Sequence, residues 1–218
     1  MEVLSQTVFT LWGYPLSVLE MLGVISGLTA VFLAWKELPV NFLVGLFNFV
    51  CYVILFFQAR LYSVMLLQVV YAVFSLYGYY QWRHPQKGQS DSKNELRIRL
   101  LGWKTWLVCV LVIVTAGLLW GWGVIRLQAV YPEYFAPPAY PWLDALLTMA
   151  SIGAQWMLSK KYWDNWVVWL VVDVFSTILY GSMGMVFTAV MYGIFSLIAL
   201  KALIDWKQTV KHYNELKQ

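Results

Sequence analysis

Hydrophobic positions in this chain gather into long runs, and most polar positions fall between those runs. A helix rises about 1.5 Å per residue, so about 20 apolar residues cross a hydrocarbon core of roughly 30 Å. The pattern predicts seven transmembrane helices, at residues 15–35, 40–57, 61–82, 103–125, 140–158, 162–181 and 183–206. The expected fold class is therefore all-α and integral to a membrane.

The spacing of the runs divides the chain into two triplets of helices. A first three-helix bundle is expected over residues 15–82, one linking helix over 103–125, and a second bundle over 140–206. A single linking helix gives both triplets the same orientation, which favours parallel repeats about an axis along the membrane normal. A weak offset near 125 residues relates the halves and would place Asn48 on Asp173.

The segments outside the runs are short. Residues 1–14 contain no Lys or Arg and are predicted to be an interfacial segment, not a cleavable signal peptide. Residues 83–102 are expected to form a cytoplasmic connector, in which Glu95–Arg99 would begin a basic interfacial helix. Residues 207–218 would form a cytoplasmic tail.

Composition agrees with a membrane protein, and charge orients it. Of the 218 residues, 61% are hydrophobic and 12% are charged, whereas soluble domains average roughly 25% charged. With seven spans, the Lys and Arg residues other than Arg60 and Arg126 fall on one side. The positive-inside rule then predicts an outer N-terminus and a cytoplasmic C-terminus. The basic residues behind the net charge of +4 are therefore explained by the orientation of the chain in the lipid bilayer. No nucleic acid is expected as a partner.

The sequence predicts neither an enzyme nor a cofactor or metal site. It contains no phosphate-binding loop of the G-x-x-x-x-G-K-[ST] type, and histidine is absent from the apolar runs. Cys51 and Cys109 lie inside apolar runs, where free thiols behave as small hydrophobic groups. Lys201 lies in the seventh predicted helix, where a lysine could bind retinal as a Schiff base. A seven-helix sensor or photoreceptor is therefore an alternative class of protein. However, Lys201 lies near the predicted cytoplasmic end and can pair with Asp205 one turn later.

The candidate ligand site centres on Asp173, a carboxylate near the middle of a predicted span. A charge at that depth costs at least about 2.5 kcal/mol, so it is expected to face the bundle interior. Trp166 and Trp169 lie at i and i+3 and Asp173 at i+7, so the three share one helix face. Aromatic faces beside a negative charge suit a cationic heteroaromatic ring. The candidate ligand-binding set is Asn48, Gln68, Tyr71, Ser75, Gln155, Trp166, Trp169, Asp173 and Tyr192.

Structural roles remain open for several of these residues. Asp173 could be a buried carboxylate bonded to Ser or Thr hydroxyls, and Trp166 could be an interface anchor. Asn48 and Gln68 could instead form hydrogen bonds between helices, worth about 0.6 kcal/mol each.

Several motifs carry a resemblance to a known family. In the second half they are Trp142-Leu143-Asp144, Ala154-Gln155-Trp156, Lys160-Lys161-Tyr162 and Asn165-Trp166-x-x-Trp169-x-x-x-Asp173. In the first half they are Phe57-Gln58-x-x-Leu61-Tyr62, Gln68 and Tyr77-Gly78-Tyr79-Tyr80-x-Trp82. Together they resemble the PnuC family of bacterial vitamin transporters, which includes PnuC and PnuT branches and has a fold similar to SWEET proteins.

The resemblance implies facilitated diffusion of a B vitamin across the bacterial inner membrane, with trapping by a cytoplasmic vitamin kinase. It also implies ligand contacts at Asn48 and Gln68 in the first bundle and at Trp166, Trp169 and Asp173 in the second. Asp173 and Ser75 stand where Asn would be expected in nicotinamide riboside carriers. A carboxylate suits an aminopyrimidine beside a thiazolium, so the sequence favours thiamine, with nicotinamide riboside as the alternative. A homo-oligomer is left open.

Overall fold

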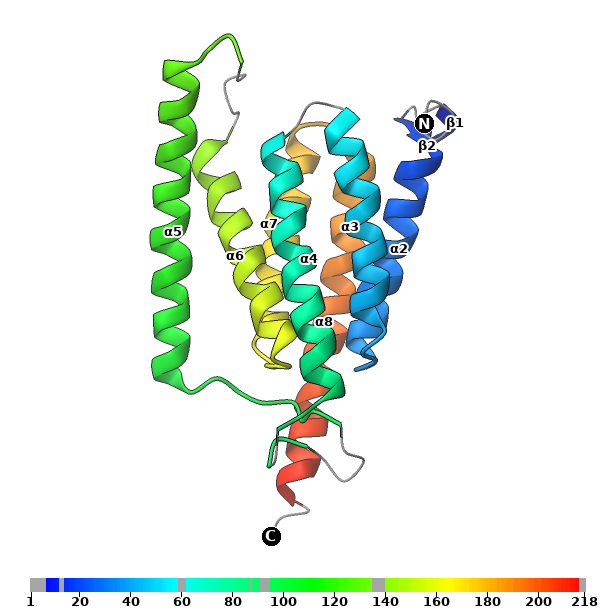
Figure 1. Ribbon diagram of the computed structural model, residues 1–218, viewed down its shortest axis with the longest axis vertical. Helices are drawn as coiled ribbons and strands as arrows, with labels where there is room; N and C mark the ends of the chain where they lie inside the picture. The colour runs from blue at the N-terminus through cyan, green and yellow to red at the C-terminus, as the bar shows by residue number, and fades with distance from the viewer. Residues whose placement is uncertain are drawn as a thin grey trace.

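The computed structural model describes residues 7–11, 14–58, 62–86, 88–90, 95–134 and 140–215, and within them the chain forms seven helices (Figure 1). The first triplet comprises α2 (Val18–Trp35), α3 (Asn41–Gln58) and α4 (Tyr62–Arg83). The linking helix is α5 (Trp103–Val130), which continues beyond the predicted residue 125. The second triplet comprises α6 (Pro141–Ser159), α7 (Asn165–Ser182) and α8 (Val186–Glu215).

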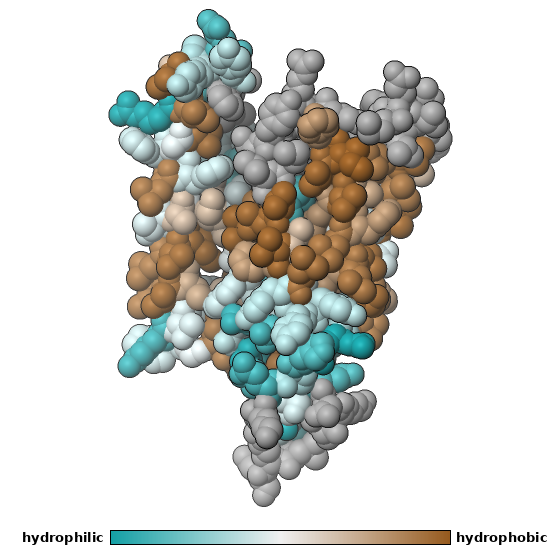
Figure 2. Space-filling model, in the orientation of Figure 1, coloured by the Kyte–Doolittle hydropathy of each residue, from teal (hydrophilic) through white to brown (hydrophobic). Residues whose placement is uncertain are grey.

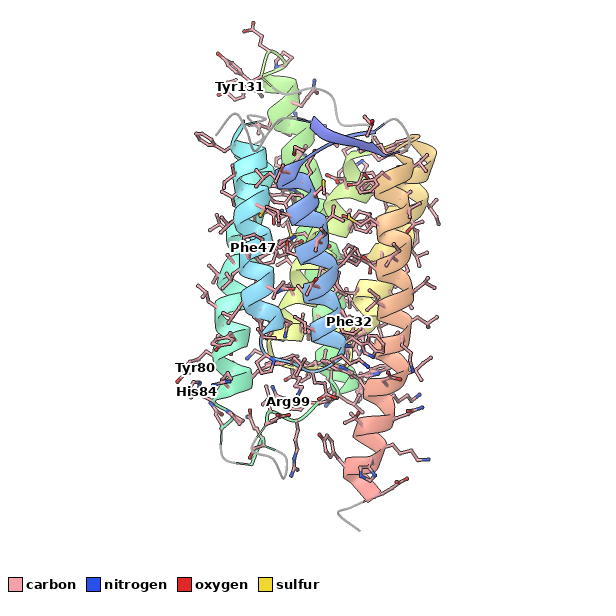
Figure 3. The ribbon with its side chains drawn as sticks, turned by 90° about the vertical axis from the view of Figure 1, so that its right-hand side faces the viewer. Phe32, Phe47, Tyr80, His84, Arg99 and Tyr131 are labelled. Carbon is pink, nitrogen blue, oxygen red and sulfur yellow. The ribbon has the colours of Figure 1, made fainter. Side chains whose placement is uncertain are left out.

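The helices form a membrane domain. By length and hydropathy, α2, α5, α7 and residues Val186–Tyr213 of α8 can each cross a bilayer, and α3 carries the shorter apolar stretch Asn41–Ile54. Figure 2 shows hydrophobic side chains covering the middle of one face, with hydrophilic side chains gathered below them. Phe47 and Tyr80 are 50% and 60% exposed and point away from the bundle (Figure 3). Such large exposed apolar side chains match a surface covered by lipid.

A short hairpin precedes the first helix, and the sequence did not predict it. Strand β1 (Thr7–Leu11) pairs antiparallel with β2 (Tyr14–Ser17), while residues 1–6 of the predicted interfacial segment lie outside the described residues. Ser17 then caps α2. The Ser17 amide donates to Glu20 Oε2 at 2.8 Å, and the Glu20 amide donates to Ser17 Oγ at 3.2 Å. This capping box explains Glu20 as a helix-start residue.

Six helices form a closed ring, in which neighbours follow the order α2, α3, α4, α6, α7, α8 and back to α2. The linking helix α5 stands outside the ring against α6 (Figure 1). Gly117 permits this close approach, because a Cβ there would lie 2.7 Å from Leu146 Cδ2. The ring therefore contains three helices from each triplet, and the triplets meet at two seams, α4–α6 and α8–α2.

The two triplets repeat with an offset of 124 residues, the difference between the first residues of α7 and α3 (165 and 41). Asn41 and Asn165 begin these helices, and each side-chain amide donates to the carbonyl oxygen three residues earlier, in Leu38 and Tyr162. The predicted offset near 125 was thus one residue too long. In the correct register Asp173 corresponds to Phe49 and not to Asn48. The mid-span charge therefore has no charged counterpart at the equivalent position of the first triplet.

The ring has two distinct ends. The hairpin end carries β1 and β2, and the connector end carries the α2–α3 turn, the α6–α7 turn and the segment between α4 and α5 (Figure 1). Within this connector segment, Glu95–Arg99 is extended and not helical as predicted, and Arg99 forms a bridge with Tyr162. Leu96 and Ile98 are 2% and 5% exposed because they pack into the core. Their burial explains the extended conformation, since alternate residues of an extended segment point the same way.

The main core lies at the connector end of the ring. Its largest side chains are Phe42, Trp82, Trp166 and Trp206, each at most 3% exposed. Nearby, Lys201 Nζ lies 2.6 Å from Asp205 Oδ1, which confirms the predicted pairing of these side chains.

Candidate functional site

Asp173 lies on the buried face of α7, near the middle of that helix. Asp173 is only 4% exposed, whereas Val171 and Val174 on the outer face of α7 are 49% and 41% exposed. Among the described residues, no donor forms a hydrogen bond or ion pair with the Asp173 carboxylate. A buried carboxylate that lacks such a partner is costly, so it attracts a cation or a strong hydrogen-bond donor.

Tyr192 lies near this carboxylate, and tyrosines from both triplets lie near Tyr192. The Tyr192 hydroxyl on α8 lies within electrostatic reach of Asp173, Tyr180, Tyr71 and Tyr52. The rings of Tyr180 and Tyr192 stack at 5.4 Å with an angle of 12° between their planes. We call Asp173 with these four tyrosines the mid-depth cluster. It draws side chains from α3, α4, α7 and α8, and so from both halves of the ring.

Tyr52 and Tyr180 were not among the predicted site residues. Tyr180 lies seven residues after Asp173, which is the spacing that places two side chains on one helix face. That spacing was available in the sequence and could have identified Tyr180. No comparable signal identified Tyr52, because its position depends on how α3 is placed between α2 and α4 in the ring.

The seam between α4 and α6 brings other predicted residues next to the mid-depth cluster. Gln155 Nε2 donates to Ser75 Oγ at 3.2 Å, and Ser75 is 1% exposed. Tyr71 lies beside Ser151 of α6, with its ring 5.7 Å from the ring of Phe49. Gln68 is half-buried one turn from Tyr71 on the same helix. Polar groups therefore continue from Asp173 across the inter-triplet seam.

Asn48 lies at the right depth, but its amide is engaged within the first triplet. Asn48 Nδ2 donates to the Gly23 carbonyl oxygen and, at 3.2 Å, to Ser26 Oγ. These bonds join α3 to α2, as in the structural alternative considered from the sequence. A Cβ on Gly27 would lie 3.2 Å from Asn48 Nδ2, so small residues on α2 make room for this contact.

The two tryptophans separate in depth. Trp166 is 2% exposed, and its ring meets the Trp206 ring edge-on at 5.5 Å in the core at the connector end. Seven helical residues separate Trp166 from Asp173, which corresponds to about 10 Å along the axis. Trp169 is half-buried between these levels and packs against both hydrophobic clusters, the main core and a smaller cluster within the second triplet. Trp169 is thus the indole placed near Asp173 in this conformation.

Two hollows in the structure lie away from the candidate site. One hollow of about 220 Å³ lies at the connector end beside Arg97, Arg99 and Val210, and another of about 160 Å³ lies beside Met21 and Ile25. Neither hollow borders Asp173. Chemically, a carboxylate near a tyrosine hydroxyl and aromatic faces suits a hydroxylated aromatic cation.

Comparisons with known proteins identify membrane transporters as relatives of this chain. Residues 17–208 match the family described as nicotinamide mononucleotide transporter. The chain is 33% identical over 211 residues to nicotinamide riboside transporter PnuC of Escherichia coli (strain K12), covering 89% of this chain and 87% of that protein. It is 26% identical to the riboflavin/roseoflavin transporter RibM of Streptomyces davaonensis, covering 94% and 92%.

A solved structure supports the same fold. The crystal structure of the vitamin B3 transporter PnuC superposes with a TM-score of 0.67 at 23% identity, covering 89% of this chain and 83% of that one. The match over residues 17–208 spans both helix triplets and the linking helix. The chain therefore belongs to the PnuC family of vitamin transporters, as a multi-pass protein of the inner membrane.

Proposed function

We propose that this protein carries nicotinamide riboside across the inner membrane by facilitated diffusion and binds it at the mid-depth cluster. The observation that carries the proposal is the buried, unpaired carboxylate of Asp173 beside Tyr192, near which tyrosines of both triplets gather. The 33% identity to a nicotinamide riboside transporter supports this substrate. Sequence reasoning favoured thiamine, but the relatives described above are named for nicotinamide riboside and riboflavin, so they do not support thiamine.

The chemistry of the ligand fits the residues at the site. Nicotinamide riboside carries a permanently charged pyridinium ring, a carboxamide and ribose hydroxyls. Asp173 would pair with the ring charge, and the faces of Trp169 and Tyr192 would stack on the ring. A desolvated cation–π contact contributes about 2 kcal/mol. Ser75 and Gln155 would bind the ribose or carboxamide by exchanging their mutual hydrogen bond for bonds to the ligand.

The direction of net transport follows from topology and metabolism. The connector end carries basic residues such as Arg97, Arg99, Lys160 and Lys161, so the positive-inside rule assigns that end to the cytoplasm. The N-terminus would then be outside. With no phosphate-binding loop in the sequence, uptake would follow the ligand gradient. A cytoplasmic kinase that phosphorylates the vitamin would keep that gradient directed inward.

Calorimetric titration of the purified protein with three vitamins tests the substrate. Nicotinamide riboside is expected to bind at least about tenfold more tightly than thiamine or riboflavin, a difference of about 1.4 kcal/mol. Uptake into proteoliposomes that contain no ATP should then saturate with nicotinamide riboside and be blocked by the same unlabelled compound. Tight binding of thiamine with no heat from nicotinamide riboside would reverse the substrate assignment. A requirement for ATP or an ion gradient would refute facilitated diffusion.

A further inference from the structure

The turns α2–α3 and α6–α7 hold equivalent residues with opposite charges. Glu37 and Lys161 lie at the repeat offset of 124 residues, given by the difference between 161 and 37. Both adopt a left-handed backbone conformation, with φ of 60° and 57°. Non-glycine residues seldom adopt this conformation, so the same unusual turn occurs in both halves. The turns therefore place one acid and one base at matching positions on either side of the pseudo-two-fold axis.

These two side chains bind each other across the axis. Lys161 Nζ lies 2.9 Å from Glu37 Oε2, and the Lys161 side chain is 3% exposed while that of Glu37 is 24% exposed. The same ammonium lies 4.8 Å from the centre of the Trp82 ring, on α4 of the first triplet. Lys161 of the second triplet thus makes two contacts with the first triplet, one with Glu37 and one with Trp82. The two halves cannot separate at the connector end unless both contacts break.

An aromatic cluster lies between the two halves at the same end. The Trp82 ring meets the Phe42 ring edge-on at 5.1 Å, and the equivalent Trp206 and Trp166 rings meet edge-on at 5.5 Å. Trp82 and Trp206 themselves lie 6.2 Å apart. The cluster joins the two triplets through large side chains that come in equal numbers from each.

Each of these equivalent tryptophans also bonds to the opposite half. Trp82 Nε1 donates to the Leu158 carbonyl oxygen of α6 at 3.2 Å, and Trp206 Nε1 donates to the Trp35 carbonyl oxygen of α2 at 2.9 Å. Lys160 Nζ donates to the Tyr77 hydroxyl at 3.1 Å on the α4–α6 seam. The connector end is therefore closed on both seams.

The connector segment runs below the helices at the same end, near Arg99 (Figure 3). Leu96 and Ile98 pack into the aromatic cluster, and the segment is tied to the α6–α7 turn. The Arg99 amide donates to the Lys161 carbonyl oxygen at 3.0 Å, and the Trp163 amide donates to the Arg99 carbonyl oxygen at 2.8 Å. These backbone bonds make the connector part of the second triplet. A movement of Lys161 away from Glu37 would carry the connector with it.

We propose that the Glu37–Lys161 ion pair is the latch of a gate at the connector end, and that it breaks and reforms once in each transport cycle. A buried ion pair is a suitable latch because its net contribution to stability is small: both charges regain water when the gate opens. Nonpolar packing alone gives no such compensation, since apolar surface exposed to water is unfavourable. This assignment rests on the proposed transport function, but its test reads the gate separately from the substrate.

The test measures access to a buried position behind the gate. Ser75→Cys, in a chain that also carries Cys51→Ser and Cys109→Ser, places one thiol about two turns from Trp82 towards the ring centre. A membrane-impermeant maleimide is applied to vesicles of each orientation. Glu37→Gln and Lys161→Met should each raise the labelling rate from the connector side roughly tenfold, because they shift the population towards the open gate. Lys201→Met, which removes the exposed Lys201–Asp205 pair on α8, is the matched control and should leave the rate unchanged.

The exchanged pair, Glu37→Lys with Lys161→Glu, distinguishes a latch from a merely structural contact. It restores the ion pair but not the contact of Lys161 with Trp82, so it should bring the labelling rate and the transport rate part of the way back towards the wild type, while size-exclusion profiles show that all variants fold. Labelling rates that are equal in the wild type, Glu37→Gln and Lys161→Met would overturn the proposal, as would an exchanged pair no slower than the single variants. Transport and calorimetry with nicotinamide riboside are measured on the same gate variants with Ser75 intact, because Ser75 is a proposed ligand contact. If the vitamin fails to bind while the labelling pattern holds, the substrate assignment fails and the gate stands.

Discussion

Replacing Asp173 by Asn tests whether the buried carboxylate holds the charge of the ligand. The substitution keeps the size of the side chain and removes one negative charge that no described residue pairs with. A cation about 4 Å away would gain up to about 4 kcal/mol at an effective dielectric constant of about 20. Part of that gain is lost to ligand desolvation, which leaves about 2–3 kcal/mol, the range of charge-assisted hydrogen bonds. The dissociation constant for nicotinamide riboside should therefore rise roughly 30- to 150-fold.

The same substitution should have the opposite effect on stability. In the empty protein the Asp173 carboxylate is buried without a donor, so a neutral amide removes a desolvation cost and the melting temperature should stay level or rise. Calorimetric titration and thermal unfolding in the same detergent measure the two effects. Asp144→Asn is the control, since Asp144 is exposed in the first turn of α6 and should change affinity less than about threefold. A lower melting temperature with unchanged affinity would show that Asp173 is a structural carboxylate.

Three further changes separate ligand contacts from helix packing. Trp169→Ala should weaken nicotinamide riboside binding by about 2 kcal/mol if the indole stacks on the cation, and calorimetry would show no change if it does not. Asn48→Ala should lower the melting temperature, since it removes the α2–α3 bonds to Gly23 and Ser26, and should leave affinity within about threefold. A large loss of affinity without loss of stability would instead make Asn48 a ligand contact. Gly117→Val should destabilise the α5–α6 contact by about 1–3 kcal/mol, and an unchanged melting temperature would contradict the close approach to Leu146.

The helical architecture was predictable because it depends on local features of the sequence. Long apolar runs and short polar connections identified both triplets and the linking helix between them. The exact repeat was not predictable from residue identities, since few equivalent residues match. The structure reveals it through the helix starts at Asn41 and Asn165, which share the same side-chain bond. The hairpin was missed because its pairing depends on backbone bonds and not on a strong alternating pattern.

A residue of the candidate site could be predicted where a charged side chain stands inside an apolar span. Asp173 was identified from its charge alone, because a carboxylate at that depth needs an explanation. Tyr52 and Glu37 were missed because tyrosine and a turn glutamate are ordinary residues at their positions in the sequence. Their roles depend on which helices of the ring become neighbours. Trp166 shares the predicted face with Asp173, yet it packs against Trp206 in the closed conformation, which helix periodicity could not reveal.

The charge of the ligand provides the most direct test of the central claim, that Asp173 binds a positively charged vitamin ring. Nicotinamide riboside and its dihydro form differ by a hydride at the ring: the first is a cation and the second is neutral, with nearly the same shape. Titration of the wild-type protein with each compound should give a dissociation constant at least about tenfold larger for the neutral form. Equal affinities for the two forms would contradict the account.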